Sequence, residues 1–465
     1  MKKVIATAMV GFMAMGMLAG CGGGGAKDDA ATAIKVGGTG PLTGGAAIYG
    51  LAVQRGAEIA VEEVNALGGV QFELKMEDDA HDAEKAVNAY NALKDWGMQI
   101  LMGTVTTAPC VAVCAQTAKD NMFQVTPSAS STDVLKNGNA MQICFTDPNQ
   151  GTASAQYIGE NGLATKVAVI YDSSDVYSAG IYETFAAEAK NQTFEIVAAE
   201  AFTADNKTDF SVQVQKAKDA GAELVFLPIY YQEASLILNE ADKQAYDAKF
   251  FGCDGLDGIL SVEGFDTALA EGVMLLTPFV ADEDKELTKN FVAAYGEQFG
   301  GIPNQFAADA YDGIYAIKAA LEKAGATADM SAEEINEVMK AAMLEITVDG
   351  LTGAGMTWTE DGEVNKIGTY NYYIVYRDEE RMYSRITKNV ATISVVDTIN
   401  PKFENLALVG GKGYWFDKEY KQYATNGTNG SVLITKYTSQ VNSGAVKTYQ
   451  YTYDSANNNI TKITN

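Results

Sequence analysis

The sequence predicts an α/β protein of parallel sheets with helices on both faces, followed by a small β-rich segment at the C-terminus. Two observations lead to the α/β prediction. Short apolar runs of strand length recur along the chain, and the segments between them repeat apolar residues with a period of 3.6. Such alternation is typical of parallel sheets, since the connection between parallel strands is usually a helix. A third observation, a change in composition near residue 380, predicts the C-terminal segment.

The predicted strands are short runs rich in β-branched and aromatic residues. In chain order they are IKVGGT (34–39), FELKMED (72–78), QILMGTV (99–105), MFQVTPS (122–128), KVAVIYD (166–172), AELVFLPIY (222–230) and FFGCDG (250–255).

Two helices between these strands carry clear boundary signals. The first follows Ala57, Val61, Val64 and Leu67 and should end at the glycine pair 68–69. The second should begin after Asp82, a good N-cap, and stop at Gly97. Both helices thus fill gaps between predicted strands, as an α/β fold requires.

The N-terminus has the pattern of an export signal. Met1-Lys2-Lys3 is a short positive region, residues 4–17 are apolar, and Leu-Ala-Gly-Cys (18–21) offers a small-residue cleavage site. A transmembrane helix is the alternative, but the apolar run is short and ends in glycines rather than charges. The motif resembles the bacterial lipobox. That resemblance implies a lipoprotein signal peptide at 1–20, a lipid on Cys21, and a chain anchored to the membrane outside the cytoplasm.

Residues 21–33 are glycine-rich and polar, and we expect them to form a flexible tether. The formal net charge of −26 argues against a nucleic-acid partner, which would require a basic face.

Residues 381–465 carry a net charge of the opposite sign, with 10 Lys and Arg against 5 Asp and Glu. They also alternate like strands around turn signals such as Asn429-Gly430, and are predicted to form a β-rich C-terminal extension.

A candidate site lies where QILMGTV leads into TTAPCVAVCAQTAKD. Ligands of α/β sheets bind beyond the carboxyl ends of strands. Thr107 is a predicted N-cap and Pro109 suits the first turn, so free N–H groups, the helix dipole and two hydroxyls would meet there. This is a site for a carboxylate, although an ordinary capped helix would give the same pattern.

Three other motifs have competing interpretations. Cys110 and Cys114 lie one helical turn apart, but a zinc site needs about four ligands, so packing as small hydrophobes is favoured. DDAHD (78–82) holds the only histidine and could bind a cation, but a solvated loop capped by Asp82 explains it as well. GGTGPLTGG (37–45) is a broken dinucleotide motif and fits a turn better. No metal or cofactor is expected. Catalysis has little support, because a serine or cysteine hydrolase would need a base and the one histidine, in an acidic loop, is a poor candidate.

Residues 34–378 resemble the branched-chain amino-acid-binding proteins of ABC transporters, which have the periplasmic-binding-protein type I fold. The resemblance rests on the order and spacing of GPLTGGAAIYG, DDAHDAEKAVNAYNAL, LMGTVTTAP, VTPSAS, CFTDPNQG, VAVIYDSSDVYSAG and GCDGLDG. It implies two lobes joined by three crossovers that close over a ligand. Lobe 1 would comprise 34–147 and 279–346, and lobe 2 would comprise 148–278 and 347–380, with 381–465 outside both.

The resemblance also implies a set of ligand contacts. Thr107, with Thr106 beside it, would hold the α-carboxylate. The Ser128 carbonyl would meet the ammonium, Ser130 would reach both charged ends, and Asp254 from the second lobe would pair with the ammonium. The aromatic contacts would be Tyr49, Tyr177, Tyr230 and Phe306. Asp254 also suits a simple Asp-Gly turn, and each tyrosine suits a core position.

The expected function is a solute-binding lipoprotein, not an enzyme, that delivers a neutral amino acid to an ABC permease. Leucine, isoleucine and valine are the first candidates for the ligand, and another neutral amino acid or an amide is the next. A surface sensory or adhesive receptor using the same fold is the alternative, motivated by the basic, tyrosine-rich extension.

Overall fold

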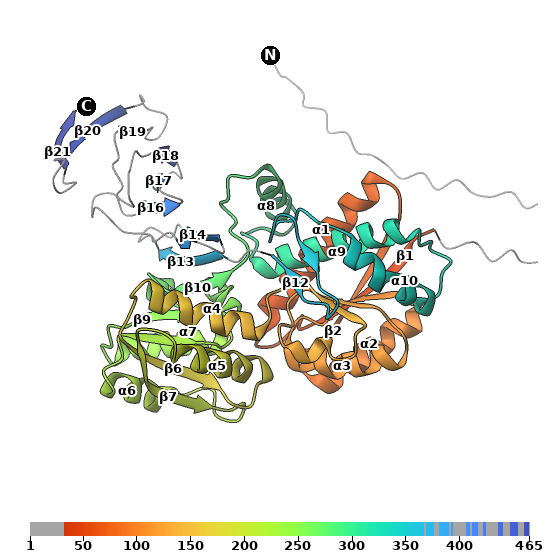
Figure 1. The fold of residues 1–465 in the computed structure, drawn as a ribbon, viewed down its shortest axis with the longest axis horizontal. Helices are drawn as coiled ribbons and strands as arrows, with labels where there is room; N and C mark the ends of the chain where they lie inside the picture. Colours follow the sequence, from red (N-terminus) through yellow and green to blue (C-terminus); the bar gives the residue numbers. More distant parts are fainter. Residues whose placement is uncertain are drawn as a thin grey trace, which may run out of the picture.

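The computed structural model describes residues 32–366 and, for the backbone alone, strands between residues 369 and 464. Two α/β lobes lie side by side, each built around its own sheet (Figure 1). This agrees with the predicted fold class. The signal peptide at 1–20, the lipid site Cys21 and nearly all of the 21–33 tether lie outside the described residues.

The first lobe contains a five-stranded parallel sheet of order β2-β1-β3-β4-β5. Its strands are β1 (Ile34–Gly40), β2 (Phe72–Asp78), β3 (Ile100–Met102), β4 (Gln124–Thr126) and β5 (Ala140–Gln142). Its helices are α1 (Ala47–Leu67), α2 (Ala83–Trp96), α3 (Thr107–Lys119), α8 (Glu286–Phe299), α9 (Gln305–Ala324) and α10 (Ala332–Glu345). The strand order reverses after β1, which is the arrangement of a doubly wound sheet.

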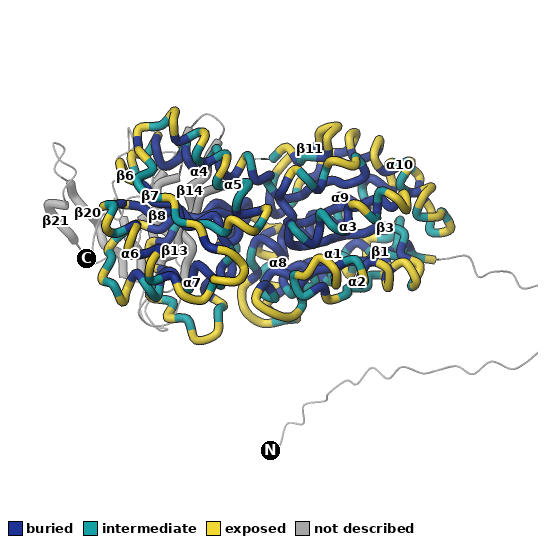
Figure 2. The backbone as a smooth tube through the Cα atoms, turned by 90° about the horizontal axis from the view of Figure 1, so that it is seen from below, coloured by how far each residue is buried: buried dark blue, intermediate teal, exposed yellow. Residues whose placement is uncertain are grey.

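Alternation along β3 shows why both faces of this sheet are covered. Ile100 and Met102 belong to the core that α1 and α9 share, whereas Leu101 packs with Tyr90 and Leu93 of α2. Successive side chains of a strand point to opposite faces, so a continuous apolar run requires a helix layer on each side. The buried backbone between exposed helix surfaces is visible in Figure 2.

The helix boundaries follow the local signals in the sequence. The Asp82 side chain accepts a hydrogen bond from the Lys85 N–H, and Gly97 ends α2 in a left-handed conformation. Helix α1 ends at Gly68 as predicted. Leu67 was expected on the buried apolar face of this helix, but it is the last residue of the helix and is 71% exposed.

The second lobe has an eight-stranded sheet of order β15-β14-β13-β10-β9-β8-β6-β7. Its parallel part comprises β6 (Lys166–Asp172), β7 (Glu195–Phe202), β8 (Leu224–Leu227), β9 (Lys249–Gly252) and β10 (Met274–Thr277). Strands β13 (Thr369–Val375), β14 (Arg381–Asn389) and β15 (Thr392–Ile393) extend it in antiparallel fashion. The helices of this lobe are α4 (Asp147–Glu160), α5 (Val176–Ala189), α6 (Ser211–Asp219) and α7 (Tyr231–Lys243).

The chain passes between the lobes three times, from β5 to α4, from β10 to α8, and from β12 (Val364–Asn365) to β13. The segment before the third crossing requires a correction, because 347–366 was assigned to the second lobe. It packs instead on the first lobe, where the Trp358 indole N–H donates to the Gln142 carbonyl at 2.8 Å. Trp358 belongs to β11 (Thr357–Trp358), which pairs with β12.

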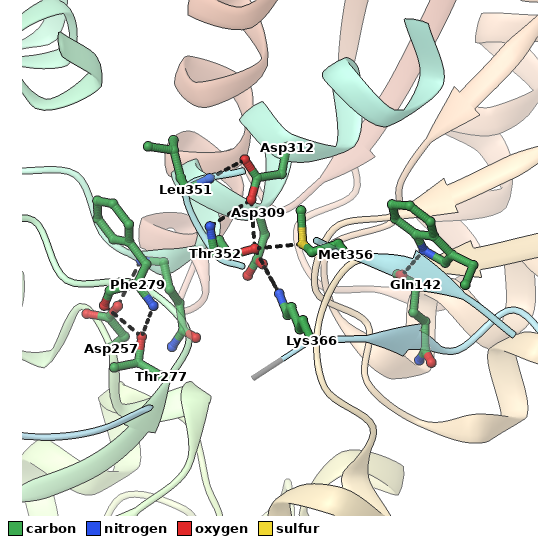
Figure 3. Close-up of polar contacts among 12 residues, drawn as sticks. Gln142, Asp257, Thr277, Phe279, Asp309, Asp312, Leu351, Thr352, Met356 and Lys366 are labelled. Atoms are coloured by element: carbon green, nitrogen blue, oxygen red, sulfur yellow. Dashed lines mark hydrogen bonds and ion pairs between the residues drawn. The ribbon is translucent and has the colours of Figure 1, made fainter. Parts of the chain in front are cut away.

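Buried carboxylates hold this segment in place (Figure 3). Asp312 of α9 accepts hydrogen bonds from the Leu351 and Thr352 N–H groups and from the Thr352 hydroxyl, all within 2.8 Å. Lys366 reaches Asp309 of the same helix at 2.9 Å. The partners in these contacts are 39 to 57 residues apart in sequence, and no local pattern predicts them.

The C-terminal extension contains the predicted strands. They form two three-stranded antiparallel sheets, β16 (Leu406–Val409), β17 (Lys412–Phe416) and β18 (Gln422–Ala424), then β19 (Lys436–Ser439), β20 (Lys447–Tyr453) and β21 (Ile460–Thr464). Strand β14 lies within the predicted extension but pairs with β13, so the second sheet continues past residue 380. Within the described part of the chain, no helix is both long and apolar enough to cross a membrane.

Candidate functional site

A cavity lies between the two lobes and leaves about 240 Å³ of space between side chains, partly open to solvent. Its lining contains every predicted ligand-binding residue except Ser130, together with Val105 and Gly255. The first lobe contributes the start of α1, the β3–α3 and β4–β5 connections, and the start of α9. The second lobe contributes the start of α5, the β8–α7 connection and the 3₁₀ turn at Asp254–Leu256.

One end of the cavity is suited to an anion. Thr106 and Thr107 are both buried at the start of α3, where the first N–H groups of the helix have no partner within the helix. The helix dipole adds a partial positive charge at the same place. Thr106, not Thr107, is the N-cap, with an extended backbone, and its hydroxyl does not cap the helix. The predicted cap was therefore one residue too late.

The opposite side of the cavity carries a buried carboxyl group. Asp254 Oδ1 accepts a hydrogen bond from the Tyr177 hydroxyl at 2.7 Å, and the Asp254 N–H donates to the Gln150 side chain at 3.2 Å. Burial raises the pKa of Asp254 to about 6, against the lowering effect of the Tyr177 hydrogen bond. At pH 7 the group is largely ionised, without a cation to pair with it on the cavity wall.

Aromatic side chains from both lobes form the remaining wall. Tyr177 and Tyr230 stack with ring centroids 4.9 Å apart, and Tyr49 lies 4.4 Å from Phe306 and 5.7 Å from Tyr230. Such a wall favours an apolar ligand group, while the two polar ends fix its orientation.

Tyr49 also ties the lobes together. Its hydroxyl donates to the Gly255 carbonyl and accepts from the Tyr231 N–H at 3.1 Å, both in the second lobe. Gln305 adds two further links, from its N–H to Asp257 at 2.9 Å and from its side chain to the Asp254 carbonyl at 3.0 Å. The lobes are therefore in direct contact around the cavity, as in a closed form.

Tyr49→Phe should shift this protein toward an open form. The substitution removes the hydroxyl and leaves a buried carbonyl and a buried N–H unpaired, at a cost of about 1–3 kcal/mol. Small-angle X-ray scattering should show a larger radius of gyration than for the wild type. Tyr246→Phe is the matched control, because the Tyr246 hydroxyl bonds to the Ala222 carbonyl within one lobe. Equal radii in wild type and Tyr49→Phe would contradict this role.

The two predicted serines differ in position. Ser128 lines the cavity, and its hydroxyl donates to the Val105 carbonyl at 2.6 Å. Ser130 lies behind the lining. Its carbonyl accepts from the Asp147 N–H at 2.9 Å, at the first crossover between the lobes. Its hydroxyl is buried without a hydrogen-bond partner among the described residues, and the predicted contacts of the Ser130 hydroxyl and N–H with the two charged ends of a ligand stay a prediction.

The competing motifs have structural explanations. Cys110 and Cys114 are free and buried, with sulfur atoms 3.9 Å apart, and they pack beside Gln124. Among the described residues, no group of three or more histidine, cysteine or acidic side chains could hold a metal ion. In the glycine-rich loop, Asp78 Oδ1 accepts from the Leu42 and Thr43 N–H groups. These donors are therefore engaged by a carboxylate within the protein.

Three residues near the cavity were missed from the sequence. Gln150 and Gln305 are amides at helix starts, and His81 was assigned to a solvated loop. His81 is instead half-buried, and its Nδ1 lies 2.9 Å from the Thr106 hydroxyl oxygen. Only the proximity of DDAHD to the end of a strand, the edge at which α/β sheets bind ligands, would have signalled it.

Comparison with known proteins identifies a family and several relatives. The family model "Periplasmic binding protein" matches residues 33–376. A Leu/Ile/Val-binding protein homolog of Brucella melitensis is 32% identical over 343 residues, covering 71% of this chain and 89% of that protein. A leucine-, isoleucine-, valine-, threonine- and alanine-binding protein of Pseudomonas aeruginosa is 27% identical, covering 69% and 86%.

A solved structure extends this comparison. The branched-chain amino acid transporter substrate-binding protein LivJ of Streptococcus pneumoniae, in complex with isoleucine, matches with a TM-score of 0.67 and 26% identity. The match covers 76% of this chain and 99% of that protein. The residues matched by the family model, 33–376, span the two lobes.

Proposed function

The chain belongs to the periplasmic binding protein family, and we propose that it is the extracytoplasmic solute-binding protein of an ABC transporter. It binds a neutral amino acid between its lobes, with leucine, isoleucine or valine as the first candidates. The relatives named for Leu/Ile/Val binding and the isoleucine complex of LivJ support this ligand class.

One observation carries the proposal. The anion-binding start of α3 and the carboxyl group of Asp254 line the same cavity but come from different lobes. A zwitterion needs a partner for each of its charges, because a buried unpaired charge is costly. A ligand that bridges the two lobes binds the closed form better and so shifts the population toward it.

We further propose that residues 1–20 are removed, that Cys21 carries a lipid, and that the receptor delivers its ligand to a permease in the same membrane. The lipobox-like motif supports the anchor, and the family supports the transport role. The relatives are named for amino-acid binding and transport, which does not favour a sensory or adhesive receptor.

A thermal-shift screen of the twenty amino acids tests this function. A ligand at one hundred times its Kd stabilises the folded state by about 2.7 kcal/mol. For domains of this size, that should raise the melting temperature by on the order of 5 °C. We expect the largest shifts for branched aliphatic amino acids. A screen in which no amino acid raises the melting temperature would refute the proposal.

The role of Asp254 should depend on pH. Since its pKa in the folded protein is about 6, the carboxyl is mostly neutral at pH 5 and mostly ionised at pH 7. A neutral carboxyl cannot pair with an ammonium, so the contribution of Asp254 to affinity should fall by about tenfold from pH 7 to pH 5. The measurement is the ratio of the Kd of Asp254→Asn to that of the wild type at each pH. A ratio that does not change between the two pH values would argue against this pairing.

A further inference from the structure

His81 is held at the cleft by an unusual loop. Ala80 and His81 have φ angles of 47° and 60°, a left-handed conformation that side chains with a Cβ rarely adopt. Side chains of the preceding strand end stabilise it, since Asp78 accepts from the Ala80 N–H and Asp79 from the His81 N–H, both at 2.9 Å. The loop thereby places an imidazole beside the start of α3.

The imidazole contacts two residues of the cavity wall, one from each lobe. Its Nδ1 lies 2.9 Å from Thr106 Oγ1 in the first lobe. Its ring meets the Tyr230 ring of the second lobe edge-on, with centroids 5.4 Å apart and an interplanar angle of 87°. His81 does not line the cavity itself, so it acts through these two neighbours.

The protonation of His81 decides what Thr106 can do. A hydroxyl has one proton to donate. In the Nε2–H tautomer of the neutral ring, Nδ1 carries no proton, so the Thr106 hydroxyl donates to it and turns only lone pairs toward the cavity. In the charged ring Nδ1 always carries a proton and donates to Thr106 Oγ1, and the Thr106 proton is free to bind an anion in the cavity. Protonation of the ring also adds a positive charge at the anion-binding end.

Charged groups from both lobes face this ring. Burial and Lys207 of the second lobe lower the pKa of His81, whereas Asp172 of the second lobe and Asp82 raise it. Asp79 lies within hydrogen-bond distance of the His81 backbone, and burial raises the pKa of Asp79 to about 7. The ring is therefore mostly neutral at neutral pH while the cavity holds no anion, and a carboxylate beside it favours the charged form.

We propose that His81 is a positioning residue for the ligand carboxylate. When the ligand binds, the His81 ring takes up a proton and thereby turns the Thr106 hydroxyl toward the ligand. This inference rests on the proposed amino-acid ligand. The loop after β2 then takes part in recognising the anionic end of the ligand. Amino-acid binding should weaken as pH rises through the pKa of His81 in the complex, because the ring then loses its proton.

The single histidine of the chain makes a direct test possible, because the imidazole resonances of untagged protein need no assignment. We would follow them by NMR against pH with and without saturating L-leucine. The pKa of His81 should be higher by about one unit or more in the complex. Leucine's decarboxylated analogue, 3-methylbutylamine, should not raise it. Leucine binding with an unchanged pKa of His81 overturns the inference alone, whereas failure of all twenty amino acids to bind overturns the proposed function and this inference with it.

Substitutions provide a second readout. His81→Gln retains a side chain able to donate to Thr106 but does not titrate. The ratio of its Kd to that of the wild type should grow about threefold or more from pH 8 to pH 6. Only the wild type gains a positive charge on His81 in this range, so only the wild type binds the carboxylate more tightly at the lower pH. Asp79→Asn is the matched control for the other group that titrates in this range, and it keeps an oxygen for the His81 N–H, so the rise in the pKa of His81 should remain. A ratio that is constant between pH 8 and pH 6 overturns the role of His81.

Discussion

Asp254→Asn should weaken amino-acid binding at least a hundredfold at pH 7. The substitution keeps the shape of the side chain and an oxygen for the Tyr177 hydroxyl, but it leaves the ligand ammonium buried without a countercharge. Breaking a buried charge pair on one side costs about 3–5 kcal/mol, and every 1.4 kcal/mol is a factor of about ten in Kd. Isothermal titration calorimetry with the best ligand of the thermal-shift screen measures this directly.

The same substitution should stabilise the ligand-free protein. The folded-state pKa of Asp254, about 6, lies above its ordinary value of 3.8. A carboxyl whose pKa is raised by folding costs stability as pH rises from the lower value to the higher one. At pH 7 that cost is up to about 3 kcal/mol, and asparagine does not have it. A higher melting temperature with weaker binding would thus separate loss of the charge from misfolding.

Asp257→Asn is the control for this experiment. Asp257 is a buried carboxyl three residues away, with a pKa raised by burial to about 7, but it does not line the cavity. Asparagine keeps an oxygen for the Gln305 N–H that links the lobes, so this replacement should change affinity far less than that of Asp254. Near-equal Kd values for Asp254→Asn and the wild type would exclude Asp254 from the ligand site.

Lys366→Met should destabilise the fold by about 3–5 kcal/mol. The Lys366 ammonium is completely buried, and it lies 2.9 Å from Asp309 and from the Thr352 hydroxyl. It also lies 5.1 Å from the centre of the Phe145 ring. Removing the lysine leaves a buried carboxylate without its partner, which is the costly way to break such a pair. Equilibrium unfolding in urea, monitored by circular dichroism, measures the loss.

The double variant Asp309→Asn with Lys366→Met distinguishes the charge from packing. If the unpaired carboxylate causes the loss, replacing it with a neutral amide should restore much of the stability. A single variant that loses less than about 1 kcal/mol would show that Lys366 contributes no more than an exposed ion pair does. The pair also anchors the last residues before the third crossover, so ligand affinity should be measured for both variants.

Local patterns predicted much of this protein. The alternation of strands and helices predicted parallel sheets with helices on both faces, since side-chain period and connection type are properties of short segments. Asp82 and Gly97 predicted the ends of α2 because capping requires only neighbouring residues. The motifs around Thr107 and Asp254 predicted two sides of a cavity, with the resemblance to a known family supplying their pairing.

Contacts between distant residues were decided only by the folded structure. The segment 347–366 was placed in the wrong lobe because its partners, Asp312 and Gln142, are far away in sequence. The Ser130 carbonyl bonds to the Asp147 N–H at the first crossover, and His81 reaches Thr106 and Tyr230 through a left-handed loop. A hydrogen bond or an ion pair across such separations depends on where whole elements dock, and short stretches of sequence carry no record of that docking.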